Sequence, residues 1–378
     1  NTINRVNILK LIKPTTIESG LKYSLATGTW GIKSNKTKQG VAQVANRLTY
    51  NATISHMRRI NTPIDKTAKL IQPRKLHGTQ MGVICPAETP EGVSVGLVKN
   101  MSIMGSITIS SNSTHLRDLL RTMDVRYFDG SNVEIFAHRN TKVIVNGDII
   151  GVHMDPLNLY KKIKTCKRQG IISVYSGVIW DIPHSEIWIN TEGGRCIRSL
   201  YIVDDNKIRM TNNMLSKIIK GKITYSDLVV GNTNYGDAVL TRPNTRMNEE
   251  NDTLPIDNSV IEYLDVEEAN FAMIAMKYED LSKGFKGPMY PIKYTHLEID
   301  PSLMMGVMAA SIPFSNHNQA PRNCYQSAMA KQALGIYSSN YRKRFDTMAH
   351  VLNSGQAPLV QTRPAKLVNA NKLPCGIN

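Results

Sequence analysis

The amino-acid sequence predicts an α+β protein of several domains, built from short helices and short strands. Its 378 residues exceed what one hydrophobic core usually organises, so several compact units are expected. Apolar residues make up 41% of the chain and charged residues 20%, which is typical of folded rather than disordered proteins. In the middle third, helical and strand patterns alternate over short distances, which indicates a mixed fold.

The first hundred residues begin with a helical pattern and continue with a proline-rich stretch. Between residues 40 and 60, apolar side chains recur at roughly helical spacing among polar and basic residues, which predicts a basic helix or a helix pair. Four prolines between residues 63 and 90 then favour extended or looping chain over helix. Loops that carry charges at fixed points are suited to binding.

Two local signals open the middle third. Ser113 can cap a short helix whose apolar residues fall between positions 116 and 123. The dipeptide Asn146-Gly147 is typical of a tight turn between two paired strands. We therefore expect a helix followed by a hairpin.

Further short elements are predicted along the rest of the chain. Asp155 followed by proline starts a helix that leads into a basic run. Alternating side chains predict strands at residues 171–175 and 186–189. Additional helices are predicted at residues 213–219 and 322–337.

Positive charge is concentrated in two separate segments. The 46 Lys and Arg outnumber the 30 Asp and Glu. From Lys22 to Lys75 there are eleven basic residues and one acid, and after Asp300 there are eight basic residues and one acid. Between Arg246 and Lys277, eight acids occur without any Lys or Arg. This distribution favours a polyanionic partner for the two cationic segments, with a merely cationic surface as the alternative.

The cysteines and the apolar stretches exclude several classes of protein. None of the five cysteines belongs to a C-x-x-C pattern, so we expect reduced thiols in an intracellular protein and no zinc site or disulfide framework. The longest apolar stretch, residues 303–314, is interrupted by glycine, serine and proline. It is shorter than the ~20 residues of a membrane helix, so no membrane segment is expected.

Two groups of polar residues are candidate anion sites. His56, Arg58 and Arg59 follow the predicted basic helix, where guanidinium groups can contact phosphate oxygens in bidentate fashion. Arg322 lies at a predicted helix start, where backbone N–H groups and the positive end of the helix dipole also point. The alternatives are an exposed helix end for the first group and an ordinary helix start for the second.

Motifs for catalysis are absent from the sequence. Glu88 and Glu91 lie three residues apart, but Pro90 between them argues against a shared helical face and so against a paired acid and base. The alternative is two loop carboxylates that meet solvent or a neighbouring arginine. No phosphate-binding glycine loop, nucleophile elbow or H-E-x-x-H helix occurs. Residue chemistry alone therefore predicts a large basic binder of polyanions.

Six ordered blocks of sequence carry a resemblance to a known family. The blocks are residues 19–31, 40–50, 55–63, 73–77, 85–100 and 312–329, and include Ser55-His-Met-Arg-Arg-Ile-Asn-Thr-Pro63 and Cys85-Pro-Ala-Glu-Thr-Pro-Glu-Gly92. In this order they resemble the second-largest subunit of DNA-dependent RNA polymerases of the archaeal and eukaryotic type. That subunit matches the β subunit of the bacterial enzyme.

The resemblance implies a domain division and an internal fragment. Residues 1–104 would be the fork region, 105–175 and 176–287 two external domains, and 288–378 the start of a β-rich hybrid-binding domain. The middle resembles the family less closely than the ends. The flanking parts of the subunit, among them its N-terminal protrusion and zinc-bearing C-terminal clamp region, are expected to lie outside this chain.

The resemblance also implies roles for single residues. Arg322 would reach the phosphates of the incoming nucleotide, with Tyr325 beside it. Glu91 would form an ion pair with Arg74 in the fork. Residue chemistry and the resemblance together give these nucleic-acid-binding candidates: Gln43, His56, Arg58, Arg59, Arg74, Lys331 and Gln332.

Cofactors and partners follow from the same resemblance. The Mg²⁺ ions of the reaction would be held mainly by the largest subunit, so we expect no catalytic residue and no metal ligand here. Expected partners are the largest and the smaller polymerase subunits, template DNA, the RNA–DNA hybrid and nucleoside triphosphates, and no membrane. A stand-alone, non-enzymatic nucleic-acid-binding protein is the alternative. The amino-acid sequence of residues 61–69 is similar to that of the same subunit from large cytoplasmic DNA viruses. The expected location is therefore the nucleus, a viral factory or a virion.

Overall fold

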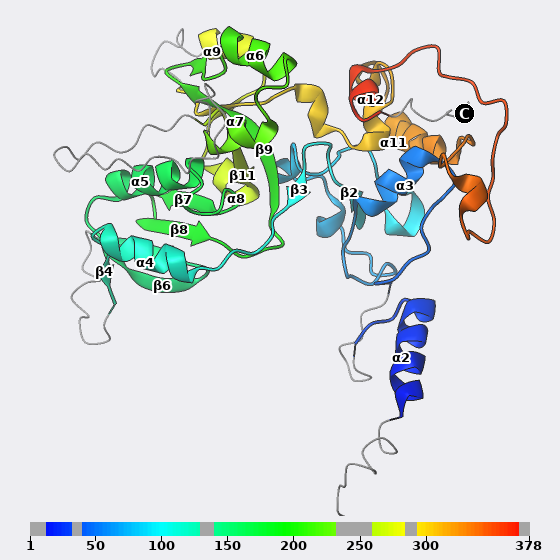
Figure 1. Cartoon of the computed structure of the whole chain (residues 1–378), viewed down its shortest axis with the longest axis horizontal. Helices are drawn as coiled ribbons and strands as arrows, with labels where there is room; N and C mark the ends of the chain where they lie inside the picture. The colour runs from blue at the N-terminus through cyan, green and yellow to red at the C-terminus, as the bar shows by residue number, and fades with distance from the viewer. Residues whose placement is uncertain (1–12, 32–39, 129–139, 232–258, 284–292, 370–378) are drawn as a thin grey trace, which may run out of the picture.

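The described part of the chain forms two lobes and one separate helix (Figure 1). The computed structural model describes residues 13–31, 40–128, 140–231, 259–283 and 293–369. The first lobe contains the described residues of 40–105 and 301–369 and lies on the right in Figure 1. The second lobe contains those of 106–300 and lies on the left.

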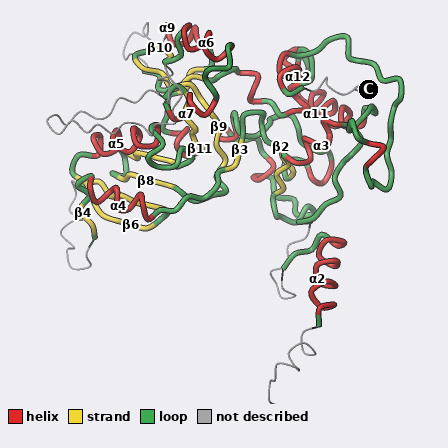
Figure 2. Tube along the Cα trace, viewed as in Figure 1, coloured by secondary structure: helices red, strands yellow, loops and turns green. Residues whose placement is uncertain are grey.

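The first lobe is made of short helices, 3₁₀ turns and one strand pair (Figure 2). Strand β1 (Arg59–Asn61) runs antiparallel to β2 (Val98–Asn100). The α-helices are α3 (Tyr50–Met57), α10 (Val307–Ala310), α11 (Ala320–Met329) and α12 (Arg363–Leu367). The 3₁₀ turns are η1 (Gln72–Arg74), η2 (Gly78–Gln80), η3 (Gly92–Ser94), η6 (Pro301–Met304), η7 (Ser315–His317), η8 (Ala330–Gln332) and η9 (Tyr341–Lys343). Because α10 packs on both α3 and α11, the two sequence segments of this lobe form one unit.

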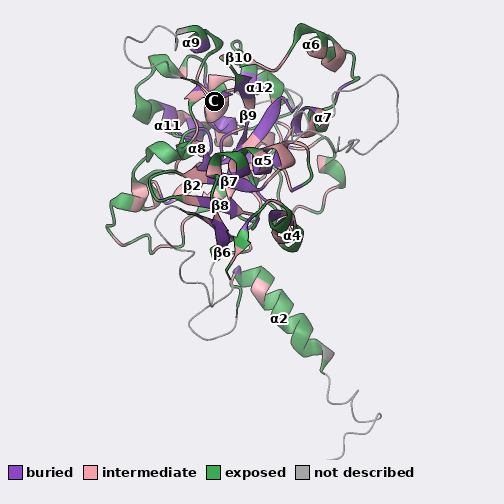
Figure 3. Ribbon diagram, turned by 90° about the vertical axis from the view of Figure 1, so that its left-hand side faces the viewer, coloured by how far each residue is buried: buried purple, intermediate pink, exposed green. Residues whose placement is uncertain are grey.

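Helix α2 (Pro14–Thr27) projects away from both lobes (Figure 3). It ends at Gly28, whose φ of 68° lies in the left-handed region that favours glycine. A Cβ at this position would lie 2.4 Å from the carbonyl oxygen of Ala42, so the close approach of the chain also requires glycine. Most of its side chains are exposed, so the described residues supply no packing surface for this helix.

A five-stranded sheet and two helices build the outer half of the second lobe. The strand order is β4-β6-β5-β8-β7, in which β5 and β8 run parallel and the other neighbours antiparallel. The strands are β4 (Arg126–Tyr127), β5 (Thr141–Val145), β6 (Asp148–His153), β7 (Gly177–Asp181) and β8 (Glu186–Asn190). The helices are α4 (Thr114–Thr122) and α5 (Pro156–Arg168).

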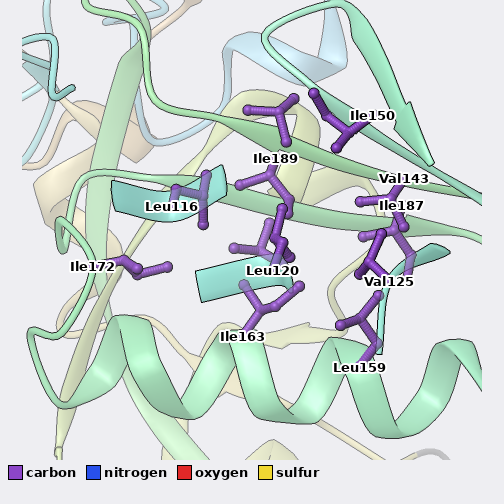
Figure 4. Close-up of a cluster of buried hydrophobic side chains, with 12 residues drawn as sticks. Leu116, Leu120, Val125, Val143, Ile150, Leu159, Ile163, Ile172, Ile187 and Ile189 are labelled. Atoms are coloured by element: carbon purple, nitrogen blue, oxygen red, sulfur yellow. The ribbon is translucent and has the colours of Figure 1, made fainter. Parts of the chain in front are cut away.

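One apolar core holds this outer half together (Figure 4). Leu116 and Leu120 of α4 and Ile163 of α5 meet the inward side chains of the sheet, among them Ile187 and Ile189. Leu120 and Ile163 are fully buried. Truncation of such a residue to alanine typically costs about 2 to 5 kcal/mol of folding free energy, because the transfer energy is lost and a cavity remains.

The turn and capping signals of this region are confirmed, with one change. Asn146 and Gly147 both have positive φ, at 52° and 88°, as the tight turn between β5 and β6 requires. Asp155 accepts a hydrogen bond from the backbone N–H of Asn158, 3.2 Å away, and so caps α5. Ser113 precedes α4 but makes no side-chain cap, and Asn112 accepts from the backbone N–H of Thr114 instead.

The inner half of the second lobe is organised around one long strand, β9 (Cys196–Asp204). Its sheet also contains β3 (Ser106–Ile107), β10 (Lys207–Ile208), β11 (Ile261–Asp265), β12 (Ile274–Ala275) and β13 (His296–Leu297). Helices α6 (Asn212–Ile219), α7 (Tyr225–Val230), α8 (Val266–Asn270) and α9 (Tyr278–Lys283) follow its strands. Because β3 directly follows the first lobe and pairs with β9, it links the two lobes.

Three predicted elements differ in the structure. Residues 171–175 are not a strand, because the N–H groups of Ile171 and Ile172 both bond the carbonyl of Cys166 and end α5 there. Within residues 40–60 only Tyr50–Met57 is helical, since Asn46 and Leu48 direct their N–H groups to side chains. The helix predicted to reach residue 337 ends at Met329 and continues only as η8.

The predicted domain boundaries stay a prediction. Two of the predicted elements between residues 105 and 287 are confirmed within short margins, namely the strand at 186–189 and the helix at 213–219. The five-stranded sheet extends from Arg126 to Asn190 and so runs across the division predicted at residues 175 and 176. Residues 232–258 lie outside the described residues.

The described ranges contain four free cysteines. Cys85, Cys166, Cys196 and Cys324 are free thiols, and Cys375 lies outside the described residues. Over those ranges no three His, Cys, Asp or Glu residues gather in a group that could bind a metal ion. No helix there has both the length and the apolar character needed to cross a membrane.

Candidate nucleic-acid interface

Three of the predicted nucleic-acid contacts meet where α3 ends. Thr49 caps α3 by accepting from the backbone N–H of Ala52, 3.0 Å away, and the helix then carries His56 in its last turn. The Nε2 of His56 lies 2.9 Å from Oε1 of Gln43. Arg59 follows in β1 with an exposed side chain. The sequence analysis named all three as nucleic-acid-binding candidates, and that role stays a prediction.

The protonation state of His56 follows from its two partners. Its Nδ1 accepts a hydrogen bond from the backbone N–H of Asn46, 3.1 Å away, which leaves Nε2 to donate to Gln43. Burial lowers the pKa of His56, and the positive charges of Arg59 and Lys331 lower it further. His56 is therefore a neutral donor that orients Gln43, and Arg59 is the cation of this group that faces solvent.

Arg58 has a different environment from Arg59. Its Nη2 donates to the carbonyl oxygens of Ser102 and Gly105, at 2.6 and 2.7 Å. Burial lowers its pKa, and its Nε is buried without a hydrogen-bond partner. Arg58 thus connects α3 to the chain after β2, and its contacts in the structure are to backbone rather than to a surface open to phosphate.

The predicted ion pair between Arg74 and Glu91 is absent from the structure. The guanidinium group of Arg74 donates instead to five backbone carbonyls, those of Lys66, Ala68, Leu70, Val93 and Val95, at 2.7 to 3.2 Å. These bonds use the whole donor set of Arg74 and fold the loop from residue 66 to 95 around it. Arg74 therefore stabilises this loop by binding its backbone at five points.

The charge of Glu91 acts on a residue of α11. It is exposed and precedes η3. Burial raises the pKa of the Cys324 thiol on α11, and the negative charge of Glu91 raises it further. The carboxylate of Glu91 therefore lies near the helix that carries Arg322 and Tyr325.

Arg322 and Tyr325 form an exposed pair on the first turns of α11. The guanidinium carbon of Arg322 lies 5.3 Å from the ring centroid of Tyr325, within the range of a cation–π contact. Both side chains are exposed, Tyr325 by 41%. The ring fixes one face of the guanidinium group, so its N–H edge stays available for an anion.

Lys331 and Gln332 follow α11 in η8 but differ in accessibility. Gln332 is exposed. The Nζ of Lys331 lies 2.9 Å from Oε1 of Glu88, and the Lys331 side chain is only 17% exposed. Glu88 was not predicted as a functional residue, and the alternative in which it meets solvent is wrong because it is buried. Its position in a proline-rich loop gives no periodic signal of burial.

The second lobe contains a cavity that is separate from the candidate interface. Its volume is about 520 Å³, and its charged lining residues are Asp124, Arg126, Asp155 and Lys162 of the second lobe. The two acids balance the two bases, so the lining favours neither an anion nor a cation. The exposed cations of the first lobe are the better candidate for a functional surface.

Comparisons with known proteins match both segments of the interface. Family models described as RNA polymerase Rpb2, domains 3, 4, 5 and 6 match residues 43–107, 143–204, 256–301 and 308–378 in that order. The RNA polymerase II subunit 2 of Arabidopsis thaliana is 43% identical over 99% of this chain and 30% of its own length. The chain belongs to the family of second-largest subunits of DNA-directed RNA polymerase. As part of a second-largest subunit, its interface forms where domains 3 and 6 meet.

Relatives of this polymerase subunit occur in eukaryotes and archaea. Subunit RPB2 of RNA polymerase II from Schizosaccharomyces pombe is 38% identical over 100% of the chain and 32% of its own length. Subunit Rpo2 from Saccharolobus shibatae is 35% identical over 97% of the chain and 30% of its own length. The chain thus spans about 30% of the length of the curated relatives it matches.

Proposed function

We propose that this chain is part of the active centre wall of a DNA-dependent RNA polymerase. Its first lobe contributes the fork, a contact to nucleotide phosphate and part of the surface that binds the RNA–DNA hybrid during templated RNA synthesis. The proposal rests on the membership in the second-largest subunit family and on the exposed cations of the first lobe. The stand-alone binding protein is not favoured, because the matching relatives are named as polymerase subunits.

One observation carries this proposal most directly. Arg322 and Tyr325 stack on the solvent-facing side of α11, and no acid among the described residues forms an ion pair with Arg322. An exposed guanidinium at a helix start suits a phosphate, because its donors and the helix dipole point toward the same charge. Arg59 and Gln332 extend the exposed polar surface of the same lobe.

The chemistry itself is assigned to other parts of the enzyme. Over the described residues, no three His, Cys, Asp or Glu side chains gather in a group that could bind a metal ion. We propose that the largest subunit holds the ions, and that this chain binds and orients the nucleotide and the hybrid. The largest subunit, the smaller subunits, template DNA and nucleoside triphosphates are its proposed partners. A nuclear location or a viral factory or virion is proposed for the assembled enzyme.

The test is an Arg322→Ala substitution in the assembled polymerase. Loss of charge-assisted hydrogen bonds to phosphate, about 1.5 to 3 kcal/mol, lowers nucleotide kcat/KM by roughly 10- to 150-fold. Arg322→Lys rescues part of this loss, because lysine keeps the charge but not the planar fork. Primer extension at varied nucleotide concentration measures both variants.

The second lobe offers a matched control for this substitution. The guanidinium carbon of Arg121 lies 5.1 Å from the ring centroid of Tyr127, so it forms the same kind of stacked pair away from the interface. Arg121→Ala is expected to leave nucleotide kcat/KM unchanged. Equal kcat/KM for the Arg322→Ala variant and the parent, in enzyme of matched assembly, would contradict the phosphate contact.

A further inference from the structure

A buried glutamate joins three segments behind the interface. Glu88 is 2% exposed and lies in the loop between the two strands of the first lobe. Its Oε1 accepts from the hydroxyl of Ser55 on α3 and from Nζ of Lys331, the latter at 2.9 Å. Its backbone carbonyl accepts from the side-chain amide of Asn100 on β2, 3.0 Å away. One residue therefore ties α3 and β2 to the turn that ends α11.

The residues around Glu88 leave room for its carboxylate and pack closely against the residue. A Cβ at Gly306 would lie 2.7 Å from Oε2, so the absence of a side chain there makes room for the carboxylate. Cys85, also buried, accepts the backbone N–H of Glu88 on its sulfur at 3.4 Å. Such close packing leaves the carboxylate few arrangements.

The direction of Lys331 follows from this network. Its ammonium group lies against a buried carboxylate, and most of its side chain is hidden from solvent. A buried charge is stabilised chiefly by its paired partner and would be strongly destabilised without it. Lys331 in η8 is thus committed to Glu88, whereas Arg322 on the preceding helix α11 faces solvent.

We propose that Glu88 is a positioning residue for the nucleotide site. It acts through Lys331 on the C-terminal end of α11 and through Ser55 on α3, and so sets the arrangement of Arg322 relative to His56 and Gln43. This inference rests on the proposed function, because the quantity that it controls is nucleotide use by the polymerase. It also reassigns Lys331 from a nucleic-acid contact to an internal ion pair.

The experiment compares four assembled enzymes: the parent, Glu88→Gln, Lys331→Met and the double variant. Each single substitution leaves one buried charge unpaired, which displaces α11, so nucleotide kcat/KM falls about tenfold. The double variant removes both charges and regains kcat/KM to within about threefold of the parent, because paired removal of polar partners is better tolerated than removal of one. A residue with only a structural role would change assembly yield and Tm but not kcat/KM per assembled enzyme.

The ion pair between Lys142 and Glu186 in the second lobe provides a control for the removal of one charge at Glu88 or Lys331. Lys142 and Glu186 lie 3.1 Å apart, and both are partly accessible. The substitutions Lys142→Met and Glu186→Gln remove the same two charges far from α11. They are expected to leave nucleotide kcat/KM unchanged.

A salt titration separates the ion pair from a phosphate contact. Each phosphate contact that is lost reduces the slope of log affinity against log salt by about 1. For hybrid binding by the assembled enzyme, Lys331→Met is expected to keep the parent slope, and Arg59→Met to reduce it. A reduced slope in Lys331→Met would overturn the assignment, because Lys331 would then neutralise a phosphate.

The kinetic outcomes distinguish the two proposals. A parent enzyme that does not extend RNA on a template would contradict the proposed function itself. A parent that extends RNA, with both single variants at its kcat/KM, would overturn only the positioning role of Glu88. If the nucleotide kcat/KM of the double variant were no higher than that of the single variants, the positioning role of Glu88 would also be overturned. The loss in kcat/KM would then not come from the broken ion pair.

Discussion

The two lobes neutralise their cations in different ways. In the second lobe, Lys164, Lys167 and Arg168 of α5 meet the buried carboxylates of Glu262 and Glu268. In the first lobe, Arg58 and Arg74 donate to backbone carbonyls, while Arg59 and Arg322 face solvent. The second lobe thus buries a closed cluster of these five charged residues, while the first lobe leaves Arg59 and Arg322 open to solvent.

The electrostatics of the closed cluster explain why its charges stay ionised. Burial alone would lower the pKa of Lys164, but Glu262 and Glu268 more than reverse this and raise it above its usual value. Burial would raise the pKa of Glu262, and Arg168, Lys164 and Lys167 lower it well below its usual range. The cluster therefore joins α5 to β11 and α8 as a set of mutually dependent charges.

This difference suggests a division of labour in the chain. Buried pairs that depend on each other fix two parts of the second lobe, whose segments match domains 4 and 5 of the family. Exposed cations can exchange water for a phosphate without breaking an internal bond. Charge balance also separates the two lobes, because residues 106–300 contain 23 Lys and Arg against 25 Asp and Glu, whereas residues 40–105 and 301–369 contain 15 against 4.

The largest expected effect on stability comes from removing the carboxylate of Glu262 from the closed cluster. Glu262→Gln leaves three buried cations with one carboxylate, and breaking a buried pair in this way costs about 3 to 5 kcal/mol. The free energy of opening α5 and β11, measured by amide hydrogen exchange in the full chain, should fall by that amount. The partly exposed pair Lys142–Glu186, with side chains 40% and 20% exposed, is the control, and Glu186→Gln should cost only ~0 to 1 kcal/mol. Equal losses for both variants would contradict the difference between buried and partly exposed pairs.

A smaller effect separates the neighbouring residues Arg58 and Arg59. Arg58→Met leaves the buried carbonyls of Ser102 and Gly105 without their donor, which should destabilise the first lobe by about 1 to 3 kcal/mol. Arg59→Met should change stability by less than about 0.5 kcal/mol, because its side chain is exposed. Hydrogen exchange in α3 and β2 measures both. If Arg59→Met were the more destabilising, our assignment of their roles would be reversed.

The closed cluster should also respond to acid through His296. This residue is 4% exposed, and burial lowers its pKa although Glu262 lies 3.3 Å from its Nε2. Because the folded pKa lies below the unfolded value of about 6.5, the unfolded state binds more protons and stability falls as pH drops below that value. The loss is at most about 1.4 kcal/mol per pH unit. Hydrogen exchange in β13 between pH 7 and 5.5 measures this slope, and His296→Gln should remove it.

Local sequence signals predicted the elements of the second lobe well. The turn at Asn146 and Gly147 and the cap at Asp155 depend on the conformational preferences of a few neighbouring residues, so a short stretch of sequence suffices. The strand predicted at residues 171–175 failed because backbone bonds to the end of α5 took its N–H groups. That competition arises only in three dimensions.

The sequence indicated where exposed residues of the candidate site lie better than it indicated the contacts of buried ones. The stacking of Arg322 on Tyr325 fits their expected placement on one helix, since they are three residues apart. The burial of Glu88 and its contact with Lys331 join segments far apart in the chain, which no periodicity reports. The pairing of Arg74 with Glu91 was wrong in the structure because five carbonyls from nearby loops already use the guanidinium group.

The smallest expected effect is the coupling between the stability effects of substitutions at Arg74 and Glu91. It tests whether these two residues form an ion pair in the first lobe. Arg74→Met should destabilise the loop that it centres, because five carbonyls lose their donor. Glu91→Gln should have little effect on stability, because Glu91 is exposed and forms no ion pair with any described residue. The double variant should therefore equal the sum of the two single effects within about 0.5 kcal/mol, as for independent sites. Hydrogen exchange in the loop around Arg74 provides the three values of this cycle. A coupling above about 1 kcal/mol would show that the two charges interact directly, and the first lobe would then contain a further ion pair beside Glu88 and Lys331.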